Sequence, residues 1–295
     1  MALALLAILI VLVLGSVAPE LTRLRQFLWL RDYLSWLALR FEGRDFWRSE
    51  LGLALIVVPL IGLAALVDWV LSDTLHGLLK FAYGTAVLFL CWGPRDLDAD
   101  ARRAARAESN SDRVEALAAL GSDAPDANAR SGDLVEAVFA AGLTRWFAPL
   151  FWFVAFGPAG ALAYRVLQLL AQSTDLRGTL PVLQAETAMR VHAALAWLPA
   201  QLMTLALALA SDFDTVIRAW REHHEAHGQG FFHLDLGFLS ATARAAVDLD
   251  DDEFANDDGS PVPNVAVEEA RRLLWRVLIV WLTLFAVVVL AGWAS

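Results

Sequence analysis

The chain has 295 residues, of which 58% are hydrophobic, and its formal net charge at pH 7 is −10. A soluble domain is about 45–50% apolar, so this composition excludes a disordered, collagen-like or disulfide-scaffold protein and favours a membrane protein. The acidic charge argues against a nucleic-acid partner, because such a partner selects a basic surface. Cys91 is the only cysteine, which excludes an intrachain disulfide and any C-x-x-C motif.

Uncharged or nearly uncharged apolar runs, close to the length of about 20 residues that a helix needs to cross a bilayer, recur along the sequence. They predict an all-α, polytopic membrane protein, organised as a single integral membrane domain with additional interfacial and cytoplasmic helices. The lipid bilayer is thus the first predicted partner. The predicted membrane segments lie near residues 1–19, 51–71, 75–92, 147–170, 191–210 and 277–293.

The first apolar run has no basic residue before it, and its first basic neighbours, Arg23 and Arg25, follow it. A secretory signal peptide has a basic region at its start. The order found here therefore favours an uncleaved anchor with its N-terminus outside.

Arginine is distributed unevenly between the polar segments. Residues 20–50 hold six arginines, residues 94–145 hold seven and residues 211–276 hold six, whereas residues 72–77 hold none and residues 171–190 hold two. The positive-inside rule then predicts that the three arginine-rich segments are cytoplasmic and that both termini are outside.

The fourth membrane segment is interrupted by the run F-G-P-A-G at residues 156–160. Proline removes a backbone donor and disfavours helix in the residue before it. The segment is therefore either a broken helix that crosses the membrane or a re-entrant hairpin that returns to its starting side. The charge balance favours the crossing, and the hairpin would move everything after residue 170 to the other side.

Three polar stretches have helical patterns. Residues 20–48 place apolar side chains at helical spacing between arginines, which predicts a helix on the membrane surface or on the protein's own core. Trp29, Tyr33, Trp36 and Trp47 favour the interface. Residues 96–120 and 212–228 carry mixed charges and predict solvated helices, the first ending at Gly121.

Two clusters resemble metal sites only weakly. His223 and His227 are four residues apart and share a helix face, as zinc ligands can, but the H-E-x-x-H spacing is absent and a solvated face is the preferred interpretation. The acidic run at 248–259 has aspartates at calcium-loop positions 1, 3 and 5 but lacks the glycine at 6 and the glutamate at 12. No metal or other cofactor is predicted.

Ionisable residues inside apolar segments are costly and are functional candidates by default. Asp68, Lys80 and Arg190 lie near segment ends, where long side chains can reach the headgroups. Arg165 lies well inside its segment and is the strongest candidate. No nucleophile–base spacing is present.

Three motifs in order over residues 140–210 carry a family resemblance. Residues 145–152, R-W-F-A-P-L-F-W, resemble the A-P-L-F-W motif of the AmpE and CobD/CbiB membrane proteins. Residues 157–165, G-P-A-G-A-L-A-Y-R, are similar to the glycine-proline turn and A-Y-R that follow. Arg190 with W-L-P-A-Q-L at 197–202 resembles the next motif, R-L-D-D-L-A-N-W-L-P-A-R-L.

CobD/CbiB proteins join an aminopropanol group to a corrinoid carboxylate with ATP. Their E-N-x-S-D-G, N-T-L-D and D-D motifs become A-A-G-L-T-R at 140–145, Q-L-L-A at 168–171 and H-A at 192–193. The carboxylates that could bind Mg–ATP or act as a base are therefore missing. Retained packing motifs without these acids point to the AmpE branch.

AmpE-like proteins are inner-membrane proteins associated with β-lactamase induction and the recycling amidase AmpD, and are described as regulatory or sensory. The resemblance thus implies a multi-pass inner-membrane regulator linked to AmpD and to cell-wall recycling, without an established reaction. Two alternatives stay open. One is an ATP-dependent corrinoid amide ligase of the CobD/CbiB type, and the other is a small-molecule transporter whose site is lined by Arg165 and the Pro158 break.

The resemblance and the cost of a buried charge also predict a ligand site near the cytoplasmic side of the membrane. Several arginines with few acids imply an anionic ligand, such as a lipid headgroup, a phosphate or a cell-wall fragment. A simple crossing separates two of the expected residues, whereas a hairpin brings all of them together. The predicted ligand-binding residues are Arg145, Tyr164, Arg165, Arg190 and His192.

Overall fold

The computed structural model describes most of the chain, and every regular element in the described part is helical, which confirms the predicted all-α class. Clustering of the contacts divides the chain into two compact units. The first unit is Met1–Pro94, Ala148–Ala196 and Ala291–Ser295, and the second is Arg95–Phe147 and Trp197–Leu290. The described residues are 2–17, 25, 27–41, 43–73, 77–93, 95–107, 109–121, 130–226, 234–247 and 265–290.

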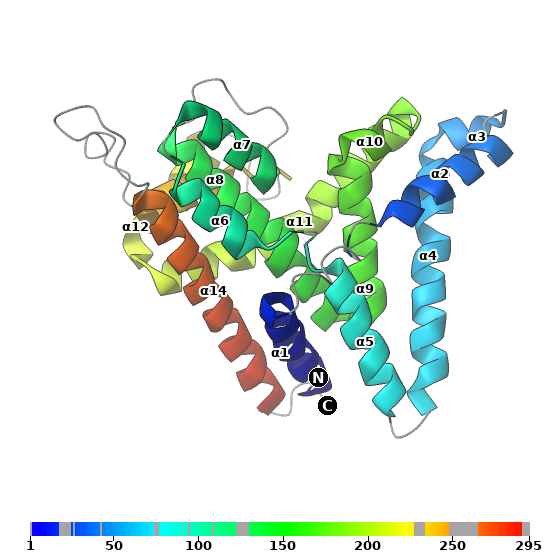
Figure 1. Ribbon diagram of the computed structural model, residues 1–295, viewed down its shortest axis with the longest axis horizontal. Helices are drawn as coiled ribbons and strands as arrows, with labels where there is room; N and C mark the ends of the chain where they lie inside the picture. Colours follow the sequence, from blue (N-terminus) through cyan, green and yellow to red (C-terminus); the bar gives the residue numbers. More distant parts are fainter. Residues whose placement is uncertain are drawn as a thin grey trace. The chain divides into compact units, whose positions relative to one another are not determined.

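In the first unit, α9 packs against both α4 and α5, and α5 also packs against α1 (Figure 1). The facing surfaces are almost entirely apolar, so burial of hydrophobic area holds these helices together. The helices of this unit are α1 (Ala2–Val17), α2 (Leu28–Phe41), α3 (Asp45–Arg48), α4 (Glu50–Val70), α5 (Leu78–Cys91), α9 (Ala148–Gln172), α10 (Thr174–Arg177) and the first part of α11 (Val182–Ala210).

In the second unit, α8 packs against α13 and α14, and α6 packs against α7 and α14. Gly142 at the end of α8 allows this approach, since a Cβ there would lie 2.8 Å from Leu274 of α14. The unit contains α6 (Leu97–Ala105), α7 (Asn110–Leu120), α8 (Ser131–Gly142), the π-helical segment Leu143–Phe147, the rest of α11, α12 (Phe213–Ala226), α13 (Gly237–Val247) and α14 (Val265–Leu290).

Within the described part of the chain, three helical stretches are long and apolar enough to span a membrane: Glu50–Val70, Ser131–Gln172 and Val182–Ala210. They contain the predicted segments at 51–71, 147–170 and 191–210 almost completely. The predicted segments at 1–19 and 75–92 correspond to the shorter apolar helices α1 and α5. The last predicted segment begins inside α14, and its end at 291–293 lies outside the described residues.

The predicted break in the fourth segment is confirmed at Gly157. Its φ of 67° and ψ of −154° are non-helical although the residues on either side are helical. A Cβ on Gly160 would collide with the carbonyl oxygen of Trp152. Residues eight apart in a straight helix are separated by about 12 Å along its axis, so α9 bends sharply at this point.

Contacts in the first unit bear on the side of the membrane that each segment occupies. The Gln184 side chain donates a hydrogen bond to the Trp47 carbonyl oxygen, and Leu180 lines the same pocket as Arg48. The starts of α4 and α11 are therefore neighbours. A simple crossing by α9 would put residues 20–50 and 171–190 on opposite faces of the membrane, which does not fit these contacts. The re-entrant hairpin would keep the two segments on one face, and the topology stays a prediction.

Contacts in the second unit do not fit the second consequence of the hairpin, which concerns the residues after α11. That alternative moved residues 211–276 to the face opposite residues 94–145. Instead Arg271 pairs with Asp98 at 2.6 Å, and Arg244 pairs with Asp133 at 3.2 Å. Because side chains cannot pair across a bilayer, these contacts do not fit that placement, and we expect both segments on one face.

Two expectations for the polar stretches need correction. The 20–48 stretch forms α2 and α3, and α2 buries Leu30, Leu34 and Leu37 as its pattern predicts, but Trp47 is buried and does not face an interface. Residues 96–120 form two helices instead of one. The second of them, α7, ends at Gly121 with φ 102°, as predicted. The 212–228 stretch forms α12, and its last two residues lie outside the described part.

Candidate functional site

Two of the five predicted ligand residues, Tyr164 and His192, are in contact in the first unit, and a third, Arg165, is buried next to Tyr164 in the sequence. Tyr164 and Arg165 lie on the second half of α9, and His192 lies on α11. The Nε2 atom of His192 is 3.3 Å from the Tyr164 hydroxyl oxygen. All three side chains are buried. The bend at Gly157 makes this possible because it sets the direction of the helix that carries Tyr164 and Arg165.

The buried Arg165 guanidinium is built into a polar chain along α9. Its Nη1 donates to Gln168 Oε1 at 2.6 Å, and Gln168 Nε2 donates to Gln172 Oε1 at 3.1 Å. Phe27 presents its ring 6.0 Å from the guanidinium carbon. A second buried cation of the same unit, Arg25, stacks over Phe89 at 4.1 Å. Aromatic faces attract guanidinium groups and lower the cost of burying them.

The side chains of the other two predicted residues are not shown in contact with these three. The Arg190 side chain is 70% exposed and pairs with Glu186 one turn earlier on α11, at 3.6 Å. Arg145 belongs to the π-helical segment of the second unit. It is buried, and donates to Asp100 at 2.9 Å and to the Ala119 carbonyl at 2.7 Å. The five-residue anion pocket stays a prediction.

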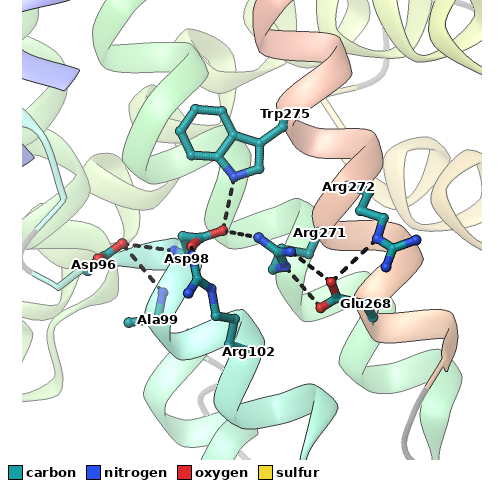
Figure 2. Close-up of polar contacts among 8 residues, drawn as sticks. All are labelled: Asp96, Asp98, Ala99, Arg102, Glu268, Arg271, Arg272 and Trp275. Carbon is teal, nitrogen blue, oxygen red and sulfur yellow. Dashed lines mark hydrogen bonds and ion pairs between the residues drawn. The ribbon is translucent and has the colours of Figure 1, made fainter. Parts of the chain in front are cut away.

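The richest polar network of the second unit centres on Asp98 of α6 (Figure 2). Its Oδ1 accepts hydrogen bonds from Trp275 Nε1 at 2.9 Å and from Arg271 Nη1 at 2.6 Å. Its Oδ2 accepts one from Arg102. Burial raises the pKa of Asp98, but the hydrogen bonds from Trp275 and Arg271 lower it by more, so the net pKa lies below its usual value.

Arg271 is held from two sides by carboxylates. Glu268, one turn earlier on α14, accepts hydrogen bonds from Arg271 Nε at 2.9 Å and from Arg271 Nη2 at 2.7 Å. The remaining nitrogen, Nη1, donates to Asp98. The bond to Glu268 is the main cause that raises the pKa of Arg271, and the same bond lowers the pKa of Glu268. Such a fork-to-fork pair fixes both side chains in orientation as well as charge. Figure 2 shows that the remaining bond of Arg271, to Asp98, joins α14 to α6.

A second carboxylate of α6, Asp100, faces the π-helical segment. Its side chain is 2% exposed. The carboxylate pairs with the guanidinium groups of Arg145 at 2.9 Å, Arg103 at 3.1 Å and Arg95 at 3.4 Å. Asp96 starts the helix by accepting the amide of Asp98 at 3.0 Å. Helix α6 thus places one acid at its cap, one toward α14 and one toward Arg145.

Beside this network lies a cleft of about 830 Å³ between α6 and α14. Five arginines line it against two glutamates, in a chain that is acidic overall. Guanidinium groups at this density can hold a phosphate or carboxylate through several charge-assisted hydrogen bonds. The lining residues are Arg102, Ala105, Arg106, Val265, Glu268, Glu269, Arg271, Arg272, Leu273 and Arg276.

Comparison with known protein families assigns this chain to a family. The model of one family, described as "Regulatory signalling modulator protein AmpE", matches residues 36–289. The chain belongs to the AmpE family. No curated protein and no solved structure matches it.

The AmpE match includes the Tyr164 cluster, the Asp98 network and the basic cleft. Sequence reasoning missed the last two because it interpreted α6 as solvated. In the structure α6 buries Leu97, Ala101 and Ala104 together with two aspartates. The signal was present, since these apolar residues share one helical face, but the basic partners on α14 are some 170 positions later in the sequence.

Of the two weak zinc candidates in this AmpE-family chain, His223 and His227, the structure describes only the first. His223 lies 3.4 Å from Asp235, and the neighbouring His224 contacts the Trp220 carbonyl oxygen through Nδ1 at 2.7 Å. His227 lies outside the described residues. Within the described part of the chain, no three His, Cys, Asp or Glu side chains gather as a metal site.

Proposed function

We propose that this chain is a multi-pass inner-membrane protein that regulates β-lactamase induction in connection with cell-wall recycling. The match to the AmpE family model over residues 36–289 carries this proposal, because the family's description names regulatory signalling. Three helices of membrane-spanning length and composition support a membrane location. A functional link to the amidase AmpD belongs to the same proposal.

Regulation is favoured over corrinoid ligation by the residues that replace the ligase-type acids. Ala171 and His192 stand where the CobD/CbiB resemblance would place carboxylates, and both are buried. Their side chains cannot hold Mg–ATP as carboxylates do. The polar side chains that do meet there, from Tyr164, Arg165 and His192, are suited to recognising a bound group.

The Tyr164–Arg165–His192 cluster is the proposed ligand-responsive centre. A guanidinium inside an apolar segment is costly unless neighbouring groups compensate it, and Arg165 is 1% exposed. The cluster joins α9 to α11 through the 3.3 Å contact between Tyr164 and His192. An anionic ligand or protein partner that alters this contact would change how the two helices pack.

The test is complementation of a strain that lacks the gene. Induction of β-lactamase by a sub-inhibitory β-lactam is expected to be abnormal in the deletion and restored by the wild-type chain. Arg165→Ala should fail to restore it with an unchanged amount of protein in the membrane, and Arg165→Lys should restore it in part. Arg31→Ala, which alters an exposed arginine of α2 in the same unit, serves as the matched control and should behave as wild type.

Unchanged induction in the deletion strain would overturn the regulatory proposal. Full complementation by Arg165→Ala would overturn the proposed centre alone. The enzymatic alternative has its own assay, because rescue of a cobalamin-synthesis mutant by this gene would establish corrinoid chemistry.

A further inference from the structure

The basic cleft between α6 and α14 has more positive charge than its own acids can balance. Glu268 pairs with Arg271 and Arg272, and Asp98 pairs with Arg102 and Arg271. These contacts use Glu268 of the lining and the neighbouring Asp98, which leaves Glu269 as the other acid that lines the cleft. Among the described residues, neither Arg106 nor Arg276 forms an ion pair.

The cleft is also rigid. Arg271 is fixed by two bonds to Glu268 and one to Asp98, and Trp275 donates to the same carboxylate from one turn further along α14. The Arg272 side chain, in contrast, is 68% exposed and has only a 3.4 Å contact with Glu268. A preorganised floor with extended arginines above it is the arrangement that an anion-binding site requires.

The exposed face of α14 changes character along the helix. Its solvent-exposed stripe begins with Glu269, Arg272 and Arg276. It continues with Ile279, one turn later, and with Val287 nearer the end of the helix, which are 60% and 57% exposed. Exposed aliphatic side chains in sequence with arginines mark the level at which a helix enters a bilayer. The cleft therefore lies at the predicted membrane surface.

We infer that this cleft binds the phosphate of an anionic phospholipid headgroup. The phosphodiester accepts hydrogen bonds from Arg272 and Arg276, while the acyl chains follow the exposed aliphatic side chains of α14. Basic pockets beside membrane helices hold anionic headgroups in this way. The inference concerns binding only and does not depend on a role in β-lactamase regulation.

The first experiment uses the full chain in non-ionic detergent and measures its thermal unfolding midpoint by tryptophan fluorescence. Short-chain phosphatidylglycerol should raise the midpoint in a concentration-dependent manner. Short-chain phosphatidylcholine should have little effect because its headgroup has no net charge. Glycerol 1-phosphate is the water-soluble comparison ligand, since it carries the phosphate without acyl chains.

The decisive variant is R272Q/R276Q. Both side chains are exposed and the Asp98 network does not need them, so the variant should fold with an unshifted midpoint in the absence of lipid. Loss of two charge-assisted contacts should raise the phosphatidylglycerol concentration for half-maximal stabilisation by at least about tenfold. The matched control is R218Q/R221Q, which removes the same charge from exposed positions of α12 in the same unit.

Each outcome decides the inference. A tenfold loss in R272Q/R276Q with a wild-type response in R218Q/R221Q supports it. An equal response of both variants would show that lipid acts elsewhere and would overturn it. Stabilisation by glycerol 1-phosphate as strong as that by phosphatidylglycerol would overturn the lipid assignment in favour of a soluble phosphate.

Discussion

At the scale of single residues, Asp98 joins α6 to α14 more than any other side chain. It accepts hydrogen bonds from Trp275, Arg271 and Arg102 while being largely buried. Removing one partner of a buried charged group leaves the remainder uncompensated, which is why such networks are sensitive to mutation. Trp275 adds a second role, because its ring packs edge-on against Trp146 with centroids 5.1 Å apart.

Asp98→Asn should lower stability at neutral pH by about 2 kcal/mol, the size of a hydrogen-bonded charge contribution. The pKa of Asp98 is depressed in the folded state, so its contribution is present above its unfolded pKa of about 3.9 and is lost as pH falls through the lower folded value. Thermal unfolding of both proteins in detergent between pH 7 and 3 checks this. The difference between them should shrink below about pH 4, and a difference that grows on acidification would contradict the assignment.

The Arg145–Asp100 pair predicts strong coupling between two buried residues. Arg145→Met should lower the free energy of unfolding by about 3 kcal/mol, because Asp100 stays buried with fewer partners. The residual contacts of Asp100 to Arg103 and Arg95 keep the cost from being larger. A double-mutant cycle with Asp100→Asn should give a coupling free energy of about 1–3 kcal/mol, and additive effects would show that the pair contributes nothing specific.

At the scale of elements, the bend in α9 determines which residues face α11. Gly157 occupies a backbone region that only glycine populates readily, and Gly160 permits the close approach of the Trp152 carbonyl. The Trp152 indole then donates to the Leu195 carbonyl of α11 at 3.0 Å. The two halves of α9 are thus held in place by backbone geometry and by one long-range hydrogen bond.

Gly157→Ala should lower stability by about 1–3 kcal/mol, because alanine is strained at this φ and ψ. Gly62→Ala in α4 is the matched control: Gly62 lies within a membrane helix with nothing within 4 Å of its added Cβ. That control should be neutral or slightly stabilising, since alanine favours helix. The thermal midpoints of the two variants in detergent give the answer, and equal midpoints would remove the argument for a glycine-specific bend.

At the scale of the whole molecule, the ion pairs and hydrogen bonds within each unit limit the membrane topology. Residues 44–50 neighbour residues 179–184, and residues 98–145 pair with residues 244–271. If α4 and α5 both cross, we expect all four segments to lie on one face of the membrane. This topology predicts that α9 enters and leaves on that face and that α11 begins and ends on it. The positive-inside rule predicts that this face is cytoplasmic.

Single cysteines in a Cys91→Ser background test this topology with a membrane-impermeant thiol reagent on spheroplasts. Cysteines at the exposed positions Ser109, Thr179 and Asp214 should resist labelling, and one at the exposed Ser72 between α4 and α5 should react. Labelling at Thr179 alone among the first three would restore the simple crossing of α9. Labelling at Asp214 alone would show that α11 crosses after a hairpin.

The AmpE resemblance could be predicted from local sequence, because its three motifs lie within residues 140–210 and the family match covers them. The break at Gly157 was equally local, since glycine and proline act on their own backbone. The solvated interpretation of α6 was wrong because mixed charges look the same whether they face water or face partners elsewhere in the chain. Only the partner residue distinguishes the two.

The sequence by itself determined the helical class, the apolar helices and the helix ends at Gly121 and Gly157, because these depend on composition, periodicity and local backbone preference. The tertiary structure alone decided which polar groups far apart in the sequence come into contact. Asp98 pairs with Arg271 and Gln184 bonds to Trp47 across separations of 173 and 137 positions. Pairing of that kind depends on how helices pack in three dimensions, and neither periodicity nor propensity along one helix contains that information.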